Sequence, residues 1–141
     1  MKGLNTLIKL HKRKLDELRR KMVLLEKQKD DLERASRKLQ QELEDEMKLA
    51  SAQADMSQFF AGFSKRIQNR QAEIAKEVRM IDRQIAKLND DIAAEFGELK
   101  KFEIAKQNAE KRAADAQTRR DTLALDEIAS QQHRRKQQTE S

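Results

Sequence analysis

Two histidines and one acidic run are the residues of this chain whose types could support catalysis or metal binding. His11 lies near the start of the chain and His133 near its end, so the two imidazoles are far apart in any helical arrangement. The run Glu42-Leu-Glu-Asp-Glu46 strings its carboxylates along one helix without the convergent ligands that a cation requires. We interpret the acidic run as a solvated helix face and His11 as a polar residue that sets register in an apolar seam.

Recognised catalytic patterns are missing from the chain. It has no glycine-rich phosphate loop, no HExxH and no nucleophile motif. It contains no Cys, which excludes disulfides, thiolate metal ligands and thiol nucleophiles. Catalysis needs convergent groups in a pocket. We therefore predict a protein that is not an enzyme, with no catalytic residue, no metal and no cofactor.

Three short basic clusters raise the possibility of nucleic-acid binding through phosphate contacts. They are Lys12-Arg13-Lys14, Arg19-Arg20-Lys21 and Arg134-Arg135-Lys136. No aromatic residue alternates with them, and no basic region precedes a zipper. Nucleic acid is therefore not the expected partner, although a basic helical nucleic-acid-binding protein stays an alternative.

The composition restricts the elements that can position these residues. The 141 residues include no Pro, no Trp, no Tyr and three Gly, and 40% of them are charged. Sheet folds need turns built from Gly, Pro and Asn, so this composition excludes them. A chain of charged and helix-forming residues with few breakers is typical of long helices or coiled coils. No apolar run reaches the ~20 residues of a membrane span, and the start lacks the layout of a signal peptide, so we expect a soluble, unprocessed protein.

The first half of the chain carries a heptad seam. Alternating steps of four and three from Leu4 meet ten apolar residues in fourteen positions, the spacing of a coiled-coil seam. These positions are Leu4, Ile8, His11, Leu15, Leu18, Met22, Leu25, Lys29, Leu32, Ser36, Leu39, Leu43, Glu46 and Ala50.

The second half repeats the seam from Phe60, with fourteen apolar residues in twenty-one positions. It is richest in Ile between Ile67 and Ile92 and thins to Ala after Phe102. A polar stretch, residues 51–58, separates the halves. We predict one coiled-coil domain, residues 1–141, with helix one at about 3–50, a turn at about 51–59, helix two at about 60–135 and a frayed tail at 136–141.

The predicted fold is all-α, a long antiparallel two-helix coiled coil in which one chain folds back on itself. A parallel coiled-coil dimer stays open, because Leu4 and Phe60 differ by eight whole heptads and the period alone does not require a turn. In the hairpin, roughly thirty C-terminal residues extend past the first helix.

Residues 1–40 carry a net charge of +7 and residues 41–60 a net charge of −4. The end of the hairpin that holds both termini is therefore expected to be basic, and its charge would steer it toward acidic surfaces.

Several segments resemble the FliJ family of bacterial flagellar type III export. The start, Leu4-Asn-Thr-Leu-Ile-Lys-Leu-His11, and the middle segment, Glu95-Phe-Gly-Glu-Leu-Lys-Lys-Phe-Glu-Ile-Ala105, are similar to family segments. The least generic piece is Leu125-Asp-Glu-Ile-Ala129, which follows Arg119-Arg120 and precedes a basic tail.

The resemblance implies a monomeric rod similar to the stalk subunit of rotary ATPases. Its open end would insert into the hexameric flagellar export ATPase, and the rod would link that ATPase to the membrane export gate, with export chaperones as further partners. The implied location is cytoplasmic, peripherally associated with the inner face of the cell membrane at the flagellar basal body. By position, the ATPase-binding residues would be Leu4, Leu7, Ile8, His11, Leu125, Asp126, Glu127, Ile128 and Ala129, and the nearest candidates for gate binding would be Phe59, Phe60 and Phe63.

Overall fold

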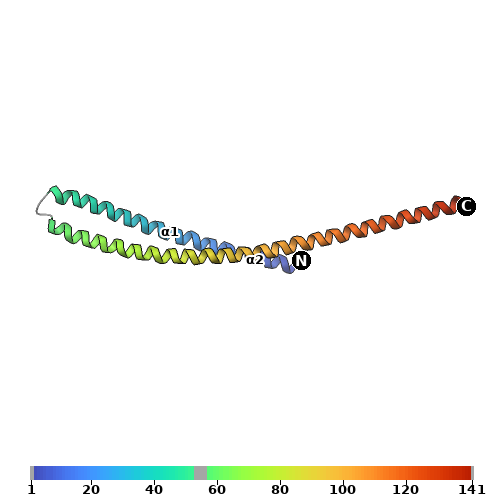
Figure 1. The fold of residues 1–141 in the computed structure, drawn as a ribbon, viewed down its shortest axis with the longest axis horizontal. Helices are drawn as coiled ribbons and strands as arrows, with labels where there is room; N and C mark the ends of the chain where they lie inside the picture. The colour runs from blue at the N-terminus through green and yellow to red at the C-terminus, as the bar shows by residue number, and fades with distance from the viewer. Residues whose placement is uncertain (1, 53–56, 141) are drawn as a thin grey trace. The chain divides into compact units, whose positions relative to one another are not determined.

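The computed structural model describes residues 2–52 and 57–140. These residues form two helices, α1 (Lys2–Ala52) and α2 (Ser57–Glu140). Neither helix contains Pro, and their glycines are few, so nothing in the sequence interrupts the backbone hydrogen-bond ladder. The two helices pack against each other as a helical hairpin (Figure 1), which confirms the predicted all-α fold and sets aside the parallel dimer.

The helix bounds are wider than the sequence analysis expected. Residues 51, 52 and 57–59 of the predicted turn are helical, and its centre, 53–56, lies outside the described residues. Residues 136–140, predicted as a frayed tail, continue α2. The single-domain assignment stays a prediction, because close packing divides the chain into two compact units. We call Arg13–Phe96 the hairpin unit, and Met1–Lys12 with Gly97–Ser141 the terminal unit.

The predicted seam is the core of the hairpin. All fourteen seam positions of α1 are buried or half-buried, including His11, Lys29, Ser36 and Glu46. In α2 every seam position from Phe60 to Ala109 is buried or half-buried. The most deeply buried side chain is Ile74, at 2% exposure. The burial pattern confirms the seam and its Ile-rich centre.

Cross-helix contacts fix the antiparallel register within the hairpin unit. The Nζ atom of Lys29 lies 2.7 Å from Oδ1 of Asp82. The Nε2 atom of Gln71 donates hydrogen bonds to the Ser36 carbonyl at 3.3 Å and to Oε1 of Gln40 at 3.1 Å. As the residue number rises along α1 it falls along α2 in these contacts, so the two helices run antiparallel.

Candidate partner-binding surfaces

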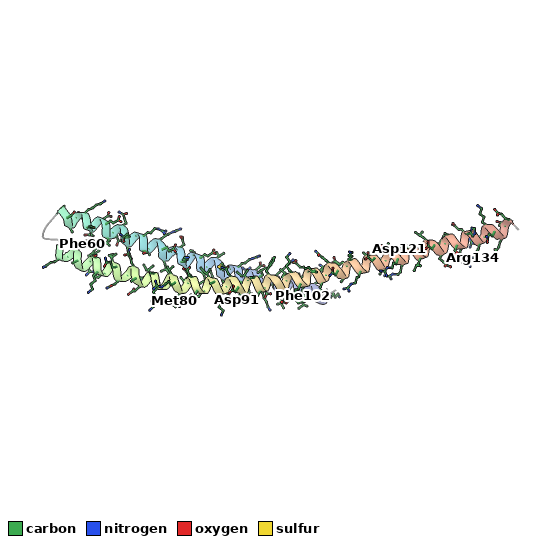
Figure 2. The ribbon with its side chains drawn as sticks, viewed as in Figure 1. Phe60, Met80, Asp91, Phe102, Asp121 and Arg134 are labelled. Atoms are coloured by element: carbon green, nitrogen blue, oxygen red, sulfur yellow. The ribbon has the colours of Figure 1, made fainter. Side chains whose placement is uncertain are left out.

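Apolar side chains near the C-terminus of α2 are exposed. Every residue from 117 to 140 is exposed, and we call this stretch the exposed segment. Figure 2 shows Asp121 and Arg134 on this part of α2. Leu123, Leu125 and Ile128 are 68%, 67% and 51% exposed. Three large aliphatic side chains within six residues of a highly charged helix make this segment a candidate interaction surface.

The apolar side chains of the exposed segment lie on two helix faces. With ~100° of rotation per residue, Leu125 and Ile128 are ~60° apart and Ala129 lies beside them. Leu123 points ~140° or more away from both and continues the line of the seam. Asp126 and Glu127, both exposed, lie outside the Leu125–Ile128 face. A partner that binds this face therefore meets two branched aliphatic side chains bordered by carboxylates.

Two side-chain hydrogen bonds within the exposed segment are local. Nε2 of Gln117 donates to Oδ1 of Asp121 at 2.9 Å, and Nη2 of Arg134 donates to Oγ of Ser130 at 3.3 Å. Both bonds join residues four apart, the spacing of neighbours on one helix face. They support the helix without covering its apolar side chains.

The N-terminal candidates divide between the seam and the surface. In the terminal unit Ile8 is 8% exposed and belongs to the core, whereas Leu4 is half-buried and Leu7 is 37% exposed. The His11 ring stacks on Phe102, with centroids 5.1 Å apart and planes inclined by 22°. Ile8 and His11 therefore hold α1 against α2 in this unit, and Leu7 is the residue of this group most accessible to a partner.

The three phenylalanines near the start of α2 lie in the hairpin unit. Phe59 is 57% exposed, and Phe60 and Phe63 are half-buried. The rings of Phe59 and Phe63 stack with centroids 6.5 Å apart. Phe63 thus supports Phe59, which presents the most accessible ring of the three.

Other exposed apolar residues were not among the sequence candidates. In the terminal unit they are Leu10, Ile104 and Leu123, at 45%, 53% and 68% exposure. The sequence could have indicated Leu123. This residue falls on a seam position of the second half that α1 is too short to cover. Leu10 and Ile104 do not fall on seam positions. In the sequence, this is the only feature that distinguishes them from the apolar residues of the core.

The described residues contain no group of three or more His, Cys, Asp or Glu placed to hold a metal ion. Among the same residues, neither helix is long and apolar enough to cross a membrane. The described surface presents exposed apolar side chains bordered by charged residues, a chemistry found in protein–protein contacts.

Comparison with known proteins agrees with this picture. No curated protein and no solved structure matches the chain. A family model described as "Flagellar FliJ protein" matches residues 1–138, almost the whole chain. The chain therefore belongs to the flagellar FliJ family, and it is a non-catalytic component of the flagellar export apparatus.

Proposed function

We propose that this protein is a stalk that inserts its exposed segment into the hexameric flagellar export ATPase and couples that ATPase to the membrane export gate. The observation that supports the proposal is the uncovered Leu125–Ile128 face of an exposed helical segment. A few buried apolar residues usually dominate the free energy of an interface. Insertion into the ATPase needs apolar residues of this kind on a helix that is not already packed against another helix of the chain.

Charge on the exposed segment has a separate role in this proposal. Arg134, Arg135 and Lys136 form an exposed basic cluster, and exposed charges act mainly on encounter rate and on salt dependence. Leu7 and the half-buried Leu4, also in the terminal unit, supply further contacts. We propose that Phe59, supported by Phe63, contacts the export gate, and that the protein works at the cytoplasmic face of the membrane beside that gate.

The test is a pulldown of the export ATPase followed by an assay of ATP hydrolysis. Leu125→Ala with Ile128→Ala should weaken ATPase binding by about tenfold or more and reduce any stimulation of hydrolysis, while the far-UV circular dichroism stays unchanged. Val23→Ala with Leu49→Ala is the matched control, because it removes exposed aliphatic groups from the hairpin unit. If the Leu125/Ile128 variant binds the ATPase as well as the wild type does, the proposed anchor is wrong.

A further inference from the structure

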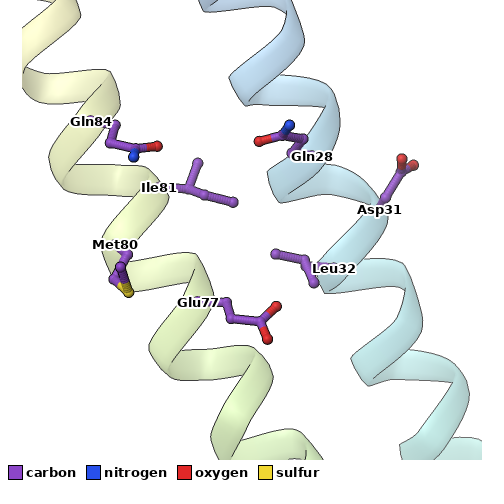
Figure 3. A pocket seen from close by; sticks show the side chains of 7 residues that line it. All are labelled: Gln28, Asp31, Leu32, Glu77, Met80, Ile81 and Gln84. Carbon is purple, nitrogen blue, oxygen red and sulfur yellow. The ribbon is translucent and has the colours of Figure 1, made fainter.

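A groove with an apolar floor runs along one side of the hairpin unit, between α1 and α2. One part of it, of about 470 Å³, is shown in Figure 3. Leu32 and Ile81 point across the gap toward the opposite helix, as do Gln28 and Gln84. A second part, of about 420 Å³, shares Gln28 and Gln84 with the first. The two parts therefore lie next to each other along the hairpin unit, on either side of Gln28 and Gln84, and we call them together the central groove.

The central groove is apolar in the middle and oppositely charged at its ends. Its apolar lining consists of Leu24, Leu25, Leu32, Met80, Ile81 and Leu88. Leu24 and Met80 remain 61% and 55% exposed. A groove of this kind accepts the apolar face of an amphipathic helix.

The charges at the two ends of the central groove fix the direction in which a helix would bind. Lys21 and Lys87 line one end together with Asp91, whereas Asp31 and Glu77 line the other. Glu77 also pairs with Arg70 at 3.6 Å, so Asp31 is the less engaged of the two carboxylates. A helix that fits should carry an acidic residue, then apolar residues, then basic residues along one face.

The exposed segment has this pattern on its Leu125–Ile128 face. With ~100° per residue, Asp121 lies on that face before Leu125, and Arg135 and Lys136 border it after Ile128. The groove from Lys21 to Asp31 covers ~15 Å of helix axis and the segment from Asp121 to Arg135 covers ~21 Å, a difference that long Lys, Arg and Glu side chains span. All these residues of the exposed segment are exposed.

We propose that the exposed segment of a second copy of this chain docks in the central groove. Asp121 then faces Lys21 and Lys87, Leu125 and Ile128 cover the apolar lining, and the Arg135–Lys136 pair faces Asp31 and Glu77. The contact goes beyond the stalk function. It covers the apolar face of the exposed segment when no ATPase is bound, and it competes with the ATPase for Leu125 and Ile128.

The first test is sedimentation of the full-length chain over a range of concentrations, with charge reversals on each side. Asp31→Lys with Glu77→Lys, and separately Arg135→Glu with Lys136→Glu, should each raise the dissociation constant of self-association by about tenfold or more, because like charges then oppose each other. The four changes together should restore association toward the wild-type value. A chain that stays monomeric at every concentration, or an association that neither reversal alters, overturns the proposal.

The second test does not depend on how the charge variants fold. Because the chain has no Cys, Met80→Cys in one sample and Ile128→Cys in another provide single thiols. A short thiol crosslinker should join the two proteins when they are mixed. Ala86→Cys, which is exposed but does not line the groove, is the control in place of Met80→Cys. Equal crosslinking yields for Met80→Cys and Ala86→Cys contradict docking in the groove.

A failure of this inference can be told apart from a failure of the stalk function. The reversal at Asp31 and Glu77 changes only the hairpin unit, so at concentrations where both proteins are monomeric that variant should bind the export ATPase as tightly as the wild type does. Loss of ATPase binding in this variant would contradict the assignment of the central groove to self-association.

Discussion

Lys29 is a charged residue in a mostly apolar seam, and its partner explains why the seam tolerates it. Its ammonium group lies 2.7 Å from the Asp82 carboxylate, and the two side chains are 35% and 48% exposed. Such a partly exposed pair contributes little net free energy. Because a parallel arrangement would not align the two residues, the pair acts mainly on orientation and register.

The pKa of Lys29 yields a prediction about pH. The hydrogen bond to Asp82, and then the charge of Asp82, raise the pKa of Lys29 above its ordinary value of 10.5. A raised pKa in the folded state means that the stabilisation is complete below the unfolded pKa and is lost as pH rises through the folded value. The difference in Tm between the wild type and Asp82→Asn should thus be constant at neutral pH and shrink above pH 10.5. A difference that does not depend on pH would contradict this account.

Buried seam residues carry the stability of the hairpin. Ile81 is 9% exposed, so Ile81→Asp places an unpaired carboxylate among apolar side chains and should cost about 3 kcal/mol or more. Leu24→Asp is the control, since Leu24 is 61% exposed and the change should cost less than about 1 kcal/mol. Urea unfolding followed by circular dichroism measures both changes. Similar losses at the two positions would show that the seam is assigned wrongly.

At the scale of the element, α2 contains two internal glycines that no close contact requires. A Cβ built on Gly62 or Gly97 meets no atom within 4 Å, and neither residue has a positive φ. Gly in a helix interior is less favourable than Ala because it loses more conformational freedom on folding. These positions therefore loosen α2 without a packing benefit.

Gly97→Ala should stabilise the protein by about 1 kcal/mol. A higher midpoint of urea unfolding, with an unchanged slope, is the expected result. Gly3→Ala is the control, because a residue in the first turn of α1 frays and should respond less. If Gly97→Ala destabilises the chain, the added methyl group is not accommodated and the description of Gly97 as free of close contacts is wrong.

At the scale of the whole molecule, the fold-back of one chain distinguishes a hairpin from a dimer. Gln40 and Gln71 are joined by a side-chain hydrogen bond of 3.1 Å. In the variant with Gln40→Cys and Gln71→Cys, a short thiol crosslinker should give an internally linked monomer at low protein concentration. Covalent dimers as the main product would support the parallel coiled coil. Each single variant is the control for links between molecules.

The sequence by itself determined the elements and their apolar faces. The lack of Pro and the scarcity of Gly leave long helices as the available elements, and the heptad spacing selects the side chains that become the core. Lys29, Ser36 and Glu46 could be assigned to the seam from position alone, and all three are half-buried. The Leu125–Ile128 face could likewise be found from the sequence, because both residues lie outside the seam positions. Its role as an ATPase contact stays a proposal.

Only the tertiary structure decided which seam was covered by which helix. The heptad register runs through the boundary between the halves without a break, so periodicity fits a hairpin and a parallel dimer equally well. In the hairpin, α1 has 51 residues and α2 has 84, and the end of α2 is left without a facing helix. Leu123 shows the consequence: it occupies a seam position in the sequence, yet it is 68% exposed. A side chain is buried only where another helix lies opposite, and the heptad pattern does not say where that helix ends.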